Sequence, residues 1–279
     1  MSPRLQSPRR VALAVERHAL IAYFVLAFAI SWLGGLAVAA PQLLRHPPLT
    51  KTTGLVMFPV MVLGPCLSAI VLTAIGEGER GFRSLFSQMA PARIPARWYA
   101  PLLIPPVLIL AVLLCLKTFV SPAYTPNRFL LGILFGLPAG FLEEIGWTGY
   151  AFPKMRSHTN ELAASTVLGL LWSLWHLPVI NYLGTAAPHG AFWLQFFLAF
   201  ALAMTAMRVL IGWLYTNTQS LLLAQFMHVI STGSLIVFSP PLVNGAQEAE
   251  WYALYGILLW IAVAVVVKRF GGSRRPPEI

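Results

Sequence analysis

Long apolar stretches, each about the length of a membrane-spanning helix, alternate with short polar segments along the chain. A helix needs roughly 20 mostly apolar residues to cross the hydrocarbon layer of a bilayer. Neither the alternating pattern of a transmembrane barrel nor an internal repeat accompanies these stretches. We therefore predict an all-α polytopic membrane protein with about eight transmembrane helices. The eight segments are Ala19–Ala40, Gly54–Ile75, Tyr99–Leu116, Phe129–Phe152, Leu162–Ile180, Ala191–Tyr215, Ser220–Phe238 and Trp251–Val267.

The basic residues predict how these helices are oriented. Most of the 19 Lys and Arg lie in the N-terminal arm, in alternate loops and in the C-terminal tail, and cytoplasmic loops carry the excess of positive charge in membrane proteins. Arg208, towards the end of the sixth segment, is assigned to the same side. We expect a multi-pass protein of a bacterial inner membrane with both termini in the cytoplasm. It divides into an arm (1–18), one membrane domain (19–270, motif core 129–238) and a tail (271–279).

Composition supports the membrane assignment and narrows the chemistry. The chain is 58% hydrophobic and 10% charged, whereas soluble domains carry about 25% charged residues. All nine acidic residues are Glu, which excludes two-aspartate intramembrane proteases and aspartyl-phosphate pumps. The net charge of +10 is explained by the cytoplasmic loops and by contact with lipid headgroups. We therefore expect the bilayer as a partner, and no nucleic acid.

Four ionisable residues lie inside apolar segments: Glu143, Glu144, His176 and His228. Each costs several kcal/mol in a membrane unless it is paired or hydrated, so such residues mark functional sites. A row of glycines at positions 132, 136 and 140 continues into Glu144. Small residues at this spacing allow another helix to approach closely.

A carboxylate and two imidazoles together could carry out acid–base catalysis. A poorly hydrated carboxylate can take a proton from water, and imidazole can orient that water or stabilise an oxyanion. Thr232 lies one turn after His228, where it either offers its hydroxyl or bonds the carbonyl four residues back. Two His and one Glu could equally hold zinc, although the HExxH motif is absent.

Three ordered motifs resemble those of a known family. They are the segment EEIGWTG at 143–149, the aromatic-x-x-x-His pattern of Trp172 and His176, and the segment HVIST at 228–232. Together they resemble the CPBP group, the CAAX protease and bacteriocin-processing proteins also called the ABI family, which includes the type II CAAX prenyl endopeptidases. The resemblance implies an intramembrane endopeptidase that acts on a peptide or protein substrate in or at the membrane.

The resemblance also implies roles for the site residues. Glu143 would activate water with help from His176, and Glu144 would support the motif. His228 and Thr232 would stabilise the oxyanion. The favoured mechanism uses no metal or other cofactor; the alternative is a zinc site with Glu143, His176 and His228 as ligands.

The chain departs from the family pattern at three motif positions. The first motif usually ends in Glu-Glu-x-x-x-Arg, but Thr148 takes the place of that Arg; Arg156, eight residues later, is a possible substitute. Phe is commoner than Trp172, and Asn often stands at Thr232. Two other functions therefore stay open: a proton-coupled transporter, and a degenerate membrane or immunity protein without catalysis.

Helix lengths predict different depths for Glu143 and His176. Glu143 falls in the cytoplasmic half of a segment that runs inward, whereas His176 lies about 21 Å beyond Leu162 at 1.5 Å per residue. We nevertheless expect Glu143, His176 and His228 to converge on one cavity in the cytoplasmic half of the membrane, because clustered and hydrated ionisable groups are tolerated there and isolated ones are costly.

Overall fold

The structure, a computed structural model, describes residues 18–45, 51–90, 94–180 and 189–270. Apart from His18, the predicted arm and tail lie outside these residues. Over the described part the chain is helical, which confirms the predicted all-α fold. Seven of its helices are long and apolar enough to cross a membrane. These spans are Ala19–Arg45, Thr52–Gly76, Ala96–Phe119, Leu130–Arg156, Gly190–Thr218, Leu221–Phe238 and Gly245–Lys268.

The fifth predicted segment, Leu162–Ile180, forms a shorter helix. It is α9 (Glu161–Trp175), which is apolar but only 15 residues long. Regular helix ends at His176, and α10 (Leu177–Ile180) turns the chain towards α2 (Ala19–Arg45) and α3 (Lys51–Gly76). Each of the eight apolar segments predicted from the sequence therefore corresponds to a helix.

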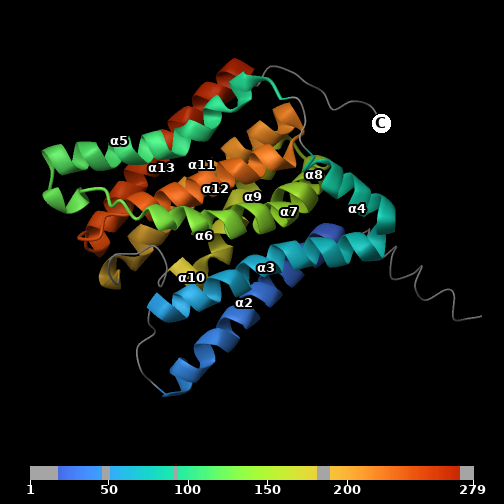
Figure 1. Ribbon diagram of the computed structural model, residues 1–279, viewed down its shortest axis with the longest axis horizontal. Coiled ribbons are helices and arrows are strands. Elements are labelled where there is room, and N and C mark those ends of the chain that lie inside the picture. Colours follow the sequence, from blue (N-terminus) through green and yellow to red (C-terminus); the bar gives the residue numbers. More distant parts are fainter. Residues whose placement is uncertain (1–17, 46–50, 91–93, 181–188, 271–279) are drawn as a thin grey trace, which may run out of the picture.

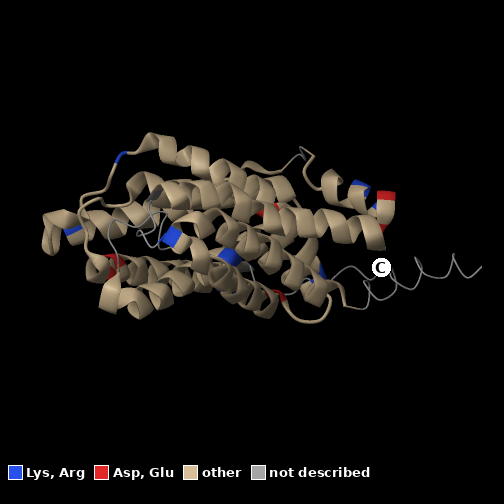
Figure 2. Ribbon diagram, turned by 90° about the horizontal axis from the view of Figure 1, so that it is seen from below, with Lys and Arg blue, Asp and Glu red and all other residues tan. Residues whose placement is uncertain are grey.

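The helices form an elongated bundle (Figure 1). A pair made of α2 and α3 packs along one side, and α5 (Ile104–Phe119) and α13 (Gly245–Phe270) lie on the opposite side. Between them run the fourth span, α9, α11 (Trp193–Thr218) and α12 (Leu221–Phe238). Charged residues lie mainly towards the two ends of the bundle, and most of its length carries uncharged residues (Figure 2). A bilayer around the middle of the bundle requires such a distribution.

The fourth span is irregular where it carries the two glutamates. It consists of α6 (Ile133–Pro138), α7 (Glu144–Gly146) and α8 (Phe152–Arg156), joined by two π-helical turns. These turns are η6 (Ala139–Glu143) and η7 (Trp147–Ala151). Single π-helical turns inside α-helices are rare and occur frequently at functional sites. The two turns set the directions in which Glu143, Glu144 and the residues after them project.

The glycine row brings this span against α12. A Cβ at Gly140 would lie 2.6 Å from the carbonyl oxygen of Gln225 and 2.7 Å from the amide nitrogen of Val229. Gly132 and Gly136 face the same helix further along. The predicted close helix contact is confirmed, and the partner is the helix that carries His228.

The predicted difference in depth disappears because the fourth span is longer than the hydropathy indicated. It continues to Arg156, so Glu143 lies 13 residues, or roughly 20 Å at 1.5 Å per residue, from that end. His176 follows the 15 residues of α9, or roughly 22 Å from the neighbouring end. The two residues thus reach similar depths from the same side.

Two polar features were not predicted. Residues 78–87, read as part of a loop, form the amphipathic helix α4 (Gly78–Ser87). His189, which lies just outside the predicted segment Ala191–Tyr215, is buried with its Nε2 3.2 Å from Oε2 of Glu248. The last helix begins at Gly245 rather than at Trp251 and so includes this glutamate. Glu248 lies in the first turn of that helix, whereas Glu143 and Glu144 lie well inside an apolar span.

Candidate active site

Glu144 is the centre of a buried polar network. Its carboxylate is fully buried and accepts from both terminal nitrogens of Arg208, each at 2.8 Å. The hydroxyl of Thr148 also donates to Oε2 of Glu144. Nδ1 of His228 lies 2.6 Å from Oε1. Bidentate pairing with Arg is among the strongest hydrogen-bonded arrangements a carboxylate makes, so this glutamate is held in one orientation with its charge balanced.

Glu143 is held differently. Its Oε2 accepts from the indole nitrogens of Trp147 at 3.1 Å and Trp172 at 2.9 Å. Its side chain is also buried. Among the described residues, no Lys or Arg pairs with it. The neighbouring glutamates therefore lie in contrasting surroundings: Glu144 faces a guanidinium, and Glu143 faces two neutral donors that occupy one oxygen and leave Oε1 available.

His176 has its orientation fixed by the main chain. Its Nδ1 lies 2.7 Å from the carbonyl oxygen of Trp172, one turn earlier on α9. A carbonyl only accepts, so Nδ1 carries the hydrogen, and Nε2 of the neutral ring is an acceptor. The ring packs edge-on against Trp172, Trp175 and Phe200, with centroids 4.9–5.3 Å apart. This histidine can accept a hydrogen bond from a water molecule.

His228 and Thr232 lie one turn apart on α12. Because a carboxylate only accepts, Nδ1 of His228 carries the hydrogen shared with Glu144, and Nε2 is the atom left for a substrate. Thr232 is half-buried, and among the described residues its hydroxyl makes no hydrogen bond. By comparison, Thr218 bonds the carbonyl of Leu214 four residues back at 2.7 Å. The hydroxyl of Thr232 is thus uncommitted.

One indole links the predicted residues. Trp172 donates to Glu143, and its ring centroid lies 5.1 Å from that of His176 and 5.0 Å from that of His228. The guanidinium carbon of Arg208 lies 4.5 Å from the centre of the same ring. The structure therefore brings Glu143, His176 and His228 around a single side chain, and Glu144 joins them through His228.

Sequence reasoning assigned Arg208 wrongly. It was counted among the charges that set orientation, but it is 1% exposed and paired with Glu144. Its position does carry a signal: it lies ten residues before the end of α11 at Thr218, too deep to reach the polar boundary. Arg156, considered as a substitute for the missing motif arginine, instead lies over the ring of Phe152.

The described residues do not fit a zinc site. Among them, no three His, Cys or Glu side chains are grouped so that they could hold a metal ion.

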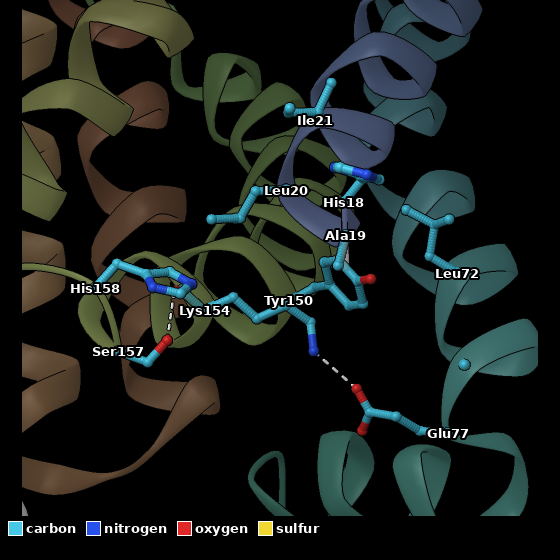
Figure 3. A pocket seen from close by; sticks show the side chains of 11 residues that line it. His18, Ala19, Leu20, Ile21, Leu72, Glu77, Tyr150, Lys154, Ser157 and His158 are labelled. Atoms are coloured by element: carbon cyan, nitrogen blue, oxygen red, sulfur yellow. Dashed lines mark hydrogen bonds and ion pairs between the residues drawn. The ribbon is translucent and has the colours of Figure 1, made fainter. Parts of the chain in front are cut away.

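A pocket of about 420 Å³ opens at the α4 end of the fourth span (Figure 3). Lys154 and Tyr150 line it, and the ammonium of Lys154 lies 2.8 Å from the carboxylate of Glu77 on the far side. Tyr150 stacks on Tyr23, whose ring meets that of Trp147 at 5.6 Å. Aromatic rings thus separate this pocket from Glu143.

Comparison with known proteins points to one family. Residues 125–233 match the model described as "Type II CAAX prenyl endopeptidase Rce1-like". The chain is 31% identical over 150 residues to a protein of Methanococcus maripaludis named CAAX prenyl protease 2. That alignment covers 53% of this chain and 51% of the relative, so the chain spans about half the length of the relative it matches. The matched segment contains every predicted site residue and also Arg208. Both comparisons support the CAAX protease family, and the resemblance predicted from the three motifs is confirmed over residues 125–233.

Proposed function

We propose that this protein is an intramembrane endopeptidase that hydrolyses a peptide bond of a membrane-associated or lipidated peptide, with Glu143 as the base that activates water. The observation that carries the proposal is the contrast between two adjacent buried carboxylates. Glu144 is neutralised by Arg208, whereas Glu143 meets only neutral donors. A carboxylate without a cation keeps its capacity to take a proton, which is the requirement for a general base.

In the first step, Oε1 of Glu143 and Nε2 of His176 each accept a hydrogen bond from one water molecule. The water oxygen attacks the carbonyl carbon of the substrate, and one of its protons passes to Glu143. The indoles of Trp147 and Trp172 keep the other carboxylate oxygen in place during this transfer. Fixed donors of this kind need no reorganisation when the reaction occurs.

In the second step, the tetrahedral oxyanion accepts hydrogen bonds from Thr232 and from His228. His228 donates through Nε2 when both of its ring nitrogens carry a hydrogen, and its Nδ1 stays on Glu144. The carbon–nitrogen bond then breaks, and the proton held by Glu143 passes to the leaving amine. The products are a new amine and a new carboxylic acid, the acid passes its remaining proton to Nε2 of His176, and Glu143 returns to its ionised form.

The substrate class follows from the location of the site and from the relative. The named residues lie among helices that cross the membrane, so the scissile bond must come to the bilayer. The relative is named a CAAX prenyl protease, and a prenylated cysteine near the end of a peptide would anchor it at this depth. A quenched fluorescent peptide with a farnesylated cysteine four residues from its C-terminus is therefore the first probe.

The test compares the reconstituted wild-type protein with Glu143→Gln. The amide keeps an oxygen for the two indoles but cannot take a proton, so cleavage should fall about 10²–10⁴-fold. Glu79→Gln, which removes an exposed carboxylate on α4, is the matched control and should cleave normally. Should wild type leave the probe intact, membrane peptides of cells that express the wild type and Glu143→Gln are compared by mass spectrometry. Equal peptide profiles, or equal cleavage by Glu143→Gln, would contradict the proposed function.

A further inference from the structure

Arg208 is a buried cation in the middle of the membrane domain. It lies ten residues, about 15 Å at 1.5 Å per residue, before the end of α11. An isolated charge at such depth is costly. Its guanidinium donates to both oxygens of Glu144, and its Nε has no hydrogen-bond partner among the described residues. Apart from a contact of 3.2 Å with the hydroxyl of Thr148, its hydrogen bonds are directed at this one carboxylate.

The same carboxylate holds His228. Oε1 of Glu144 lies 2.8 Å from one guanidinium nitrogen and 2.6 Å from Nδ1 of the imidazole. The contacts thus run from Arg208 through Glu144 to His228, the ring whose Nε2 is the proposed donor to the oxyanion. Without the guanidinium, Glu144 would lose both bidentate bonds. Thr148 and His228 alone would then hold this carboxylate, and its orientation and that of the His228 ring would be less restrained.

Thr148 occupies the position at which the first motif of the resembled family, Glu-Glu-x-x-x-Arg, has its arginine. A side chain four residues after Glu144 on a helix reaches the same carboxylate. The hydroxyl of Thr148 does so, and it also lies 3.2 Å from a nitrogen of Arg208. A hydroxyl is too short to fill the place of a guanidinium, and Arg208 enters that space from another helix. Gly169 allows this approach, because a Cβ there would lie 2.7 Å from Cα of Thr205.

We propose that Arg208 is a positioning residue that fixes Glu144 and, through it, the ring of His228. In this chain Arg208 and Thr148 act together in the place of a single arginine at position 148. The proposal rests on the proposed endopeptidase function, and it predicts the behaviour of a double variant. If the two positions form one unit, an arginine returned to position 148 should make Arg208 dispensable.

The first experiment needs no substrate. Full-length protein carrying ¹⁵N-labelled histidine is studied by NMR in detergent micelles, with the His228 signals identified by their loss in His228→Asn. Arg208→Gln should shift the Nδ1 signal of His228, and Thr148→Arg/Arg208→Gln should restore it. Arg83→Gln, at an exposed arginine, is the control. An Arg208→Gln protein with the wild-type Nδ1 signal of His228 would overturn the proposal.

The second experiment measures cleavage of the farnesylated probe, or of a peptide found by the mass-spectrometric comparison. Arg208→Gln should lower kcat about 10–100-fold with little change in KM, as removal of a group that orients a reacting residue does. The double variant should recover most of that loss. If Arg208→Gln fails to fold, a folded and active double variant supports the proposal, and a double variant that also fails overturns it.

The two proposals are distinguished by comparison with Glu143→Gln. Activity lost in Glu143→Gln but unchanged in a folded Arg208→Gln would contradict the role of Arg208 alone. Activity unchanged in Glu143→Gln would sink the proposed function.

Discussion

At the scale of single residues, two adjacent carboxylates of the site have different hydrogen-bond partners. Glu144 is paired with Arg208, and Glu143 is held by two indole nitrogens. Two neighbouring ionised carboxylates in a dry site would repel each other, and one guanidinium relieves this. Trp172 contacts most of the site: it donates to Glu143, and its ring packs against His176, His228 and Arg208.

Trp172→Phe tests the indole nitrogen directly. Phe keeps an aromatic ring between the two histidines but removes one donor to Glu143. A hydrogen bond to a charged group contributes about 1.5–3 kcal/mol, so we expect kcat to fall about tenfold to a hundredfold with KM nearly unchanged. Trp260→Phe, which removes an indole bond to the exposed carbonyl of Leu202, is the control. Wild-type kcat in Trp172→Phe would show that the bond to Glu143 has no part in the reaction.

Thr232 allows a test of the oxyanion assignment. Thr232→Val keeps the shape and removes the uncommitted hydroxyl, and loss of one oxyanion donor lowers kcat about 10²–10³-fold. Thr232→Asn supplies a longer donor and should retain activity. Thr118→Val, whose hydroxyl only bonds the carbonyl of Leu114, is the control. Near-normal turnover in Thr232→Val would leave His228 as the remaining candidate for the oxyanion.

At the scale of elements, hydropathy predicted the eight apolar helices, because each buries its backbone hydrogen bonds and needs a long apolar run. It missed α4, since a short helix with polar residues on one face has no such run. It also missed the π-helical turns, which depend on packing rather than on composition. Among site residues, Glu143, Glu144, His176 and His228 stood out as rare polar groups in apolar sequence. Arg208 did not, because a basic residue in one half of a span resembles one that sets orientation.

The seam between the fourth span and α12 sets the distance between Glu144 and His228. Gly140→Ala places a methyl group 2.6 Å from the carbonyl oxygen of Gln225, so α12 must shift. We expect a loss of about 1–3 kcal/mol in unfolding free energy, as for other overpacked sites, together with reduced cleavage. Gly34→Ala, whose methyl group would meet only the side chain of Val60, should be milder. Thermal unfolding in detergent measures both, and equal effects would argue against a special role for this seam.

At the scale of the whole molecule, the helices place α4 at one end of the bundle and the chain after α5 at the other (Figure 1). Apolar side chains such as Ile21, Leu33 and Leu44 project outward along α2. This distribution suits a bilayer around the middle of the bundle. The sequence predicted which end faces the cytoplasm from its basic residues, and that orientation is open to direct measurement.

Cysteine labelling tests the orientation. Ser84 on α4 and Thr118 at the end of α5 are both exposed. Of the native cysteines, Cys66 is buried, and Cys115 lies in the apolar helix α5. A membrane-impermeant maleimide should therefore modify Ser84→Cys only from the cytoplasmic side and Thr118→Cys only from the opposite side. Reaction of both from the same side would contradict the predicted topology.

The short helix α9 has a consequence for the surrounding lipid. Its 15 residues span roughly 22 Å, less than the ~30 Å thickness of a typical hydrocarbon layer. The bilayer beside α9 must become thinner or the helix must draw polar groups inward, and each adjustment costs a fraction of a kcal/mol per ångström of mismatch. Local thinning would bring water close to His176 at the end of this helix. Turnover should then depend on acyl-chain length, with the fastest hydrolysis in vesicles of shorter lipids.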